Sequence, residues 1–97
     1  MPNFSHIFQG NKCEKILDEK ELIRAIRFSI ASEFEAIQLY EQLAESISNK
    51  MVKQVLSDIA QEEEEHVGEF LRVLEMLSPE EIENYEEGKS EVEEKFM

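Results

Sequence analysis

Residues 52–77 read VKQVLSDIAQEEEEHVGEFLRVLEML and contain no proline and a single glycine. Apolar residues recur at alternating intervals of four and three, which is the spacing of a helix that packs against a second helix. Two positions in this apolar seam are ionisable, Glu63 and His66. The stretch therefore predicts a long helix with polar groups set into its packing face. The seam comprises Val52, Leu56, Ile59, Glu63, His66, Phe70, Val73 and Leu77.

A second stretch with the same periodicity precedes it. From Asp18 to Ile47 there is neither glycine nor proline, and Asp18 followed by Glu21 has the spacing of a capping box. This stretch also predicts a long helix, and its seam carries one ionisable residue, Glu33. Glutamate is seldom fully buried unless it is paired or binds a metal. The seam comprises Ile23, Ile26, Ile30, Glu33, Ile37, Tyr40, Ala44 and Ile47.

The three ionisable seam residues are predicted to lie at one height. Ser48-Asn49-Lys50 is the expected break, so residues 18–77 should form an antiparallel hairpin. Glu33 lies 16 residues before Asn49, and Glu63 and His66 lie 14 and 17 residues after it. At about 1.5 Å per residue, all three are about 21–26 Å from the turn. A hairpin would therefore place them opposite one another.

The flanking segments are predicted to be a shorter helix and an irregular start. Ser78, Pro79 and two acids are typical of a helix N-terminus, and that helix should run to about Glu87, where Gly88 is expected to interrupt it. Residues 1–17 show no clear periodicity. The predicted organisation is all-α: an irregular segment 1–17, a hairpin 18–77, and a short acidic C-terminal helix or tail over 78–97.

Composition limits the class of protein. The chain has 97 residues, one cysteine and a formal net charge of −13. The acidic excess disfavours nucleic acid and anionic membranes as partners, and no apolar run is long enough to cross a membrane. Cys13 cannot form an internal disulfide, and no secretory leader is expected, so we predict an intracellular protein. Residues 80–97 alone carry a net charge of −6 from eight acids and two lysines.

The spacing Glu63-x-x-His66 puts a carboxylate and an imidazole on one face of a helix, as two ligands of one metal require. Di-iron carboxylate bundles use one Glu from each of two helices and Glu-x-x-His from each of the other two. This chain supplies half of that set and half of such a bundle. We therefore expect two chains to complete a four-helix bundle. Four glutamates would then balance two divalent ions.

Oxygen and imidazole ligands suit iron or manganese, with zinc as a further substitute. Tyr40, seven residues after Glu33, is a candidate to hydrogen-bond a ligand carboxylate, or else an ordinary core aromatic. Glu35 is a candidate for a cation uptake site between subunits, or else a solvated charge. Glu62, Glu64 and Glu65 are expected to face solvent. A polar network without metal remains the alternative for the whole group, and His6 and Cys13 receive no role.

Two segments resemble the ferritin and rubrerythrin superfamily. Residues 33–40, EFEAIQLY, resemble its first-helix motif, and residues 62–71, EEEEHVGEFL, resemble its Glu-x-x-His helix. A two-helix chain with one copy of each resembles the encapsulated ferritins, whose metal Glu and Glu-x-x-His are thirty residues apart, as Glu33 and Glu63 are here. The resemblance covers residues 18–87.

This resemblance implies a ferroxidase that oxidises Fe(II) with O2 at a di-iron centre, one iron per chain, formed across a homodimer. It implies a ten-subunit ring inside an encapsulin compartment in the cytoplasm. Glu33, Glu63 and His66 match the iron ligands and Tyr40 matches the adjacent tyrosine. The family has acids on both sides of the first metal Glu, whereas here the positions are Ser32 and Glu35. Residues 91–97 do not resemble the apolar peptide that targets many members to the shell.

Two rival functions remain open. One is a rubrerythrin-like peroxidase that uses the same cluster, although a single cysteine cannot supply the usual rubredoxin-like module. The other is an acidic helical adaptor without catalysis, whose assembly would be indifferent to metal.

Overall fold

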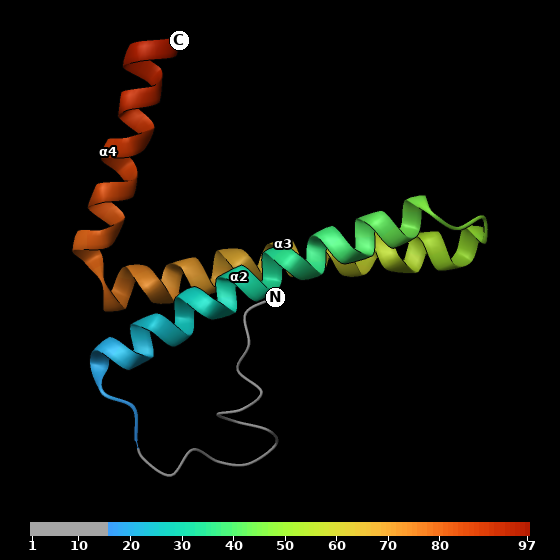
Figure 1. Cartoon of the computed structure of the whole chain (residues 1–97), viewed down its shortest axis with the longest axis horizontal. Helices are drawn as coiled ribbons and strands as arrows, with labels where there is room; N and C mark the ends of the chain where they lie inside the picture. Colours follow the sequence, from blue (N-terminus) through green and yellow to red (C-terminus); the bar gives the residue numbers. More distant parts are fainter. Residues whose placement is uncertain (1–15) are drawn as a thin grey trace.

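A computed structural model describes residues 16–97, which form three helices and no strand. Helix α2 spans Glu19–Glu45, α3 spans Lys50–Leu77 and α4 spans Pro79–Phe96. Helices α2 and α3 form a long antiparallel hairpin, and α4 leaves its open end at a steep angle (Figure 1). The all-α hairpin with an additional C-terminal helix is confirmed. Most of the predicted irregular segment, together with His6 and Cys13, lies outside the described residues.

Local signals fix both ends of the hairpin. The Asp18 carboxylate accepts a hydrogen bond from the Glu21 amide at 2.8 Å, and the Asp18 amide donates to the Glu21 carboxylate at 3.0 Å. The predicted capping box is therefore confirmed. At the turn, the Asn49 side chain accepts from the Val52 amide at 3.1 Å and starts α3. Both caps satisfy amides that would otherwise lack a partner in the first turn.

The core of the hairpin is narrow. The apolar side chains buried within the described chain are Ile30, Ala44, Ala60, Val67 and Leu74. The predicted α2 seam is confirmed, because every member is buried or partly buried. The predicted α3 seam is confirmed in part, because most of its members are partly buried and Phe70 packs against the core, whereas Val52, His66 and Val73 are exposed. The fully buried line of α3 runs through Ala60, Val67 and Leu74, beside the predicted seam. One hairpin covers only one side of α3 and leaves part of the seam facing outward.

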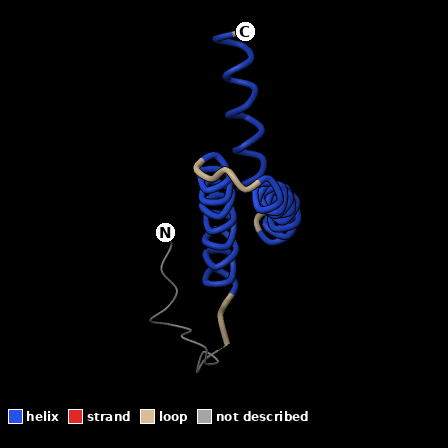
Figure 2. Tube along the Cα trace, turned by 90° about the vertical axis from the view of Figure 1, so that its right-hand side faces the viewer, coloured by secondary structure: helices blue, strands red, loops and turns tan. Residues whose placement is uncertain are grey.

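Helix α4 contacts the hairpin only near the N-terminal end of α4. It buries no residue fully, and both views show it pointing away from the hairpin (Figures 1 and 2). The predicted interruption at Gly88 is wrong, because α4 continues through it to Phe96. An isolated glycine costs a helix only about 1 kcal/mol, which the surrounding helix-forming residues outweigh. Ser78 does begin this helix, but its hydroxyl donates to the Glu81 side chain instead of capping the backbone.

Large apolar side chains remain exposed along the described helices. Phe34 is 53% exposed and Leu39 55% on α2, and Val55 is 51% exposed on α3. Such a distribution is typical of a chain that packs against a further protein surface. None of the helices within residues 16–97 is long and apolar enough to span a membrane.

Candidate metal centre

The structure brings Glu33, Glu63 and His66 together midway along the hairpin. Glu33 comes from α2, and Glu63 and His66 come from successive turns of α3. One ligand atom of each lies within 4.8 Å of the others. Within residues 16–97, no other three histidine, cysteine, aspartate or glutamate side chains meet in this way. The equal heights expected from the sequence therefore produce a contact in space.

His66 lies between the two carboxylates. Its Nδ1 atom is 3.4 Å from a Glu33 oxygen and 3.6 Å from a Glu63 oxygen. Two donors that each lie about 2.1 Å from a common ion are at most about 4.2 Å apart, so both separations suit shared coordination. Two oxygens and one nitrogen are also the donor set that iron and manganese accept. The residues present therefore fit a divalent metal ion.

The group is partly open to solvent. The side chains of Glu33 and Glu63 are 19% and 18% exposed, whereas that of His66 is 48% exposed. Within residues 16–97, no lysine or arginine forms an ion pair with either carboxylate. A metal ion would supply the positive charge that the surrounding side chains do not. The open side near His66 leaves room for a second set of ligands.

A groove extends from this open side along α3. It is lined by Glu33, His66, Glu69, Phe70 and Val73. Val73 belongs to the part of the α3 seam that α2 does not cover and is 39% exposed, whereas Phe70 is partly buried and packs against the core of the hairpin. Glu69 was not among the predicted site residues. Its spacing of three from His66 was the signal that could have identified it.

Two predicted neighbours do not join the group within one chain. Tyr40 is partly buried on α2, and among residues 16–97 its hydroxyl forms no hydrogen bond with Glu33, Glu63 or His66. Glu35 is also partly buried on α2 and lies outside the group of three. Glu62, Glu64 and Glu65 are exposed as predicted.

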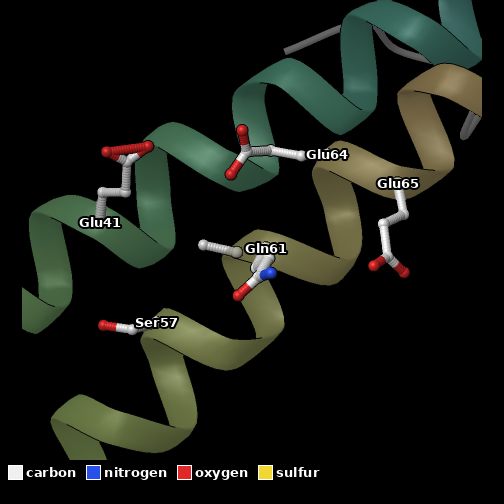
Figure 3. A pocket seen from close by; sticks show the side chains of 6 residues that line it. Glu41, Ser57, Gln61, Glu64 and Glu65 are labelled. Atoms are coloured by element: carbon white, nitrogen blue, oxygen red, sulfur yellow. The ribbon is translucent and has the colours of Figure 1, made fainter.

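A second groove lies between the two helices nearer the turn. Figure 3 shows its labelled side chains, with Glu41 from α2 and Ser57, Gln61, Glu64 and Glu65 from α3. All five are exposed. Within the described chain this groove brings no set of three ligand atoms within 4.8 Å. It is a solvated polar surface.

A carboxylate away from the candidate metal group of Glu33, Glu63 and His66 holds α4 in place. Glu81 accepts hydrogen bonds from Arg27 at 2.6 and 3.0 Å, and also from the Tyr85 hydroxyl and Ser78. The Arg27 guanidinium is the main cause that lowers the pKa of Glu81 from 4.5 to about 2, with Tyr85 and Ser78 acting in the same direction. The Tyr85 pKa is raised by the same carboxylate. This contact joins residues 54 positions apart, and sequence periodicity gave no signal for it.

Comparison with known proteins shows which family this chain matches. The rubrerythrin family model matches residues 25–97. A ferritin-like–encapsulin shell fusion protein of Pyrococcus furiosus is 40% identical over 81 residues, which cover 84% of this chain and 24% of that protein. The encapsulin nanocompartment cargo protein EncC of Myxococcus xanthus is 34% identical over 64 residues, which cover 66% of this chain and 49% of that protein. The chain thus spans about a quarter and about half of these two relatives.

A solved structure agrees over nearly the whole chain. The crystal structure of the encapsulated ferritin domain from Pyrococcus furiosus matches with a TM-score of 0.87 and 35% identity. The match covers 97% of this chain and 96% of that one. It includes the hairpin that carries Glu33, Glu63 and His66 together with the projecting α4. The chain belongs to the rubrerythrin family of ferritin-like proteins and lies close to the encapsulated ferritins.

Proposed function

We propose that this protein is a ferroxidase that oxidises Fe(II) to Fe(III) with O2 at a di-iron centre shared by two chains. The observation that carries the proposal is the group Glu33, Glu63 and His66, with ligand atoms within 4.8 Å of one another. It contains half the ligands of a di-iron carboxylate bundle. Each bound Fe(II) would lose one electron, and O2 would accept it. The protein supplies two carboxylates and one imidazole per chain, and the iron is expected at one per chain.

The second chain would pack against the half-exposed α3 seam. Two copies bring four glutamates, whose charge balances two divalent ions, and cover the open side of His66. We expect the hairpins to pair antiparallel, because parallel pairing would bring two α4 segments, each with a net charge of −6, to the same end. A ring of ten subunits is the assembly that the family resemblance implies.

Antiparallel pairing gives Tyr40 a place in the site. Tyr40 lies seven residues, or about 10 Å, from Glu33 toward the turn, and Phe70 lies seven residues from Glu63 in the opposite direction. Tyr40 of the second copy would then be level with Phe70, beside the groove that reaches Glu33 and His66. Its hydroxyl would donate a hydrogen bond to a ligand carboxylate and orient it. Glu35 stays a candidate for cation uptake between subunits.

The names of the relatives support a role inside an encapsulin compartment. One is a fusion with a shell protein and the other is a cargo protein. We infer that this chain also works as encapsulin cargo, within the cytoplasm, where oxidised iron would be stored. The acidic surface of the chain, with a net charge of −13, would raise the local concentration of Fe(II).

A rubrerythrin-like peroxidase is the second candidate, and the family match favours it. The two functions differ in the oxidant. A ferroxidase consumes Fe(II) quickly with O2 alone, whereas a peroxidase turns over H2O2 with a separate electron donor.

The first experiment follows Fe(II) oxidation under air by absorbance. Wild type is compared with Glu33→Gln and Glu63→Gln, which remove a ligand charge at nearly constant volume. Glu64→Gln is the matched control, because Glu64 is an exposed neighbour on the same helix. We expect fast oxidation in wild type and the control and a rate near that of protein-free buffer in both ligand variants. Equal rates in all four proteins would exclude this group as the oxidation site.

A further inference from the structure

The groove beside the metal group contains one carboxylate that the proposed site does not use. Glu69 lines it together with Glu33 and His66. It lies one turn beyond His66 on α3 and is exposed. Three residues along a helix correspond to about 60° around its axis, in the direction away from α2. A second hairpin packed on the α3 seam would therefore leave Glu69 at the outer rim of the site.

Among the described residues, no basic side chain beside Glu69 compensates its negative charge. Arg72, one turn further along α3, is paired with Glu75 at 2.6 Å. Within residues 16–97, no lysine or arginine forms an ion pair with Glu69. The adjacent walls of the groove are the apolar side chains of Phe70 and Val73. Low-dielectric walls concentrate the field of a carboxylate on the space between them, which favours a cation there.

We propose that Glu69 is the carboxylate that captures hydrated Fe(II) at the groove and passes it to Glu33 and His66. The inference rests on the proposed function and adds the route by which the metal reaches the site. Glu64 provides a contrast on the same helix, because it lines the other groove, which contains none of the three ligands. A cation held at Glu69 is already in the groove that two of the ligands line.

The test compares Glu69→Gln with wild type and with Glu64→Gln, which makes the same charge change outside this groove. The first readout is anaerobic binding of Co(II), followed by stopped-flow absorbance. For a unit charge and a divalent ion about 8 Å apart in water, the Coulomb energy corresponds to roughly a fivefold change in rate. We expect Co(II) association to be roughly fivefold slower in Glu69→Gln at low salt, with the difference shrinking at high salt.

The second readout is the dependence of Fe(II) oxidation on iron concentration. Glu69→Gln should raise the half-saturating Fe(II) concentration and keep the limiting rate, because Glu69 delivers the ion and does not ligate it during oxidation. Glu64→Gln should match wild type in both assays. Active wild type with identical behaviour of the two variants would overturn the capture role and leave the ferroxidase proposal intact. Wild type that neither binds Co(II) nor oxidises iron would overturn both.

Discussion

At the scale of single residues, Glu81 connects α4 to α2 through an unusually complete set of donors. Its side chain is 13% exposed and accepts from Arg27, Tyr85 and Ser78. A charged, two-point hydrogen bond of this kind is stronger than a typical surface ion pair, although Arg27 is itself half-exposed. Glu81 therefore sets the position of α4 relative to the hairpin.

This contact predicts a specific dependence on pH. Because the pKa of Glu81 is about 2 in the folded protein and 4.5 ordinarily, its stabilisation is present above pH 4.5 and is lost as the pH falls toward about 2. We expect Glu81→Gln to lower the free energy of unfolding by about 1 kcal/mol at pH 7. Urea unfolding at several pH values measures this difference, which should shrink below pH 4.5 and vanish once the pH is below about 2. Glu83→Gln, an exposed acid on α4, should have a small effect throughout.

The imidazole of His66 gives a second prediction at this scale. His66→Ala should abolish most Fe(II) oxidation, since it removes the nitrogen ligand, and should keep the helical content, since the side chain is 48% exposed. Free imidazole added to the variant should restore part of the rate. The measurements are iron oxidation and circular dichroism. Oxidation at the wild-type rate without imidazole would remove His66 from the site.

The proximity of Glu33, Glu63 and His66 could be predicted from sequence because helical periodicity relates distant residues directly. Glu33, Glu63 and His66 lie on apolar seams at similar distances from the turn, and the hairpin geometry then brings them together. The contact between Arg27 and Glu81 obeys no such period, since it depends on the angle between α4 and the hairpin. Glu69 has helical spacing from His66, but only the groove beside it distinguishes it from an ordinary surface acid.

At the scale of helices, the boundaries of the hairpin were predictable and the orientation of α3 was not. Capping side chains at Asp18 and Asn49 specify where α2 and α3 begin. The apolar residues of α3, however, lie on two adjoining faces. One face contacts α2, and the other is left partly open. The buried line through Ala60, Val67 and Leu74 belongs to the first. Periodicity alone cannot separate the two, because both contribute to one apolar surface.

Gly88 supplies a prediction about α4. It lies within the helix, and a Cβ atom added to it would meet no atom within 4 Å. Gly88→Ala should therefore stabilise α4 by about 0.5–1 kcal/mol by reducing the entropy of the unfolded segment. Hydrogen exchange of the α4 amides should slow accordingly, while exchange in α2 and α3 stays the same. Faster exchange of the α4 amides would show that a partner chain packs closely against Gly88 and that the added methyl group prevents this contact.

At the scale of the whole molecule, a single hairpin is incomplete in two respects. It brings together two carboxylates and one imidazole, which are half of the ligands that the proposed di-iron centre needs, and it leaves apolar side chains of α3 such as Val55 and Val73 exposed. Both deficits would be reduced by a second copy. Metal binding and association should therefore be linked, because uncompensated carboxylates oppose association until a cation neutralises them.

Salt should modify this linkage in a defined direction. The chain has a net charge of −13, so two copies repel one another at low ionic strength. We expect salt to favour association of the metal-free protein and, by screening the acidic surface, to slow Fe(II) capture. Sedimentation velocity with chelator and stopped-flow oxidation, each across a salt series, measure the two effects. Association that weakens as salt is added would show that ion pairs between chains dominate instead.

The most direct test of a metal site shared by two chains is native mass spectrometry during an anaerobic Fe(II) titration. The account predicts that iron appears only on species with an even number of chains, at one iron per chain in the shared centres, and that added iron increases their population. Glu63→Gln should bind less iron and show a smaller increase. Iron bound to single chains, or an oligomer distribution unchanged from chelator to saturating Fe(II), would contradict the shared di-iron centre.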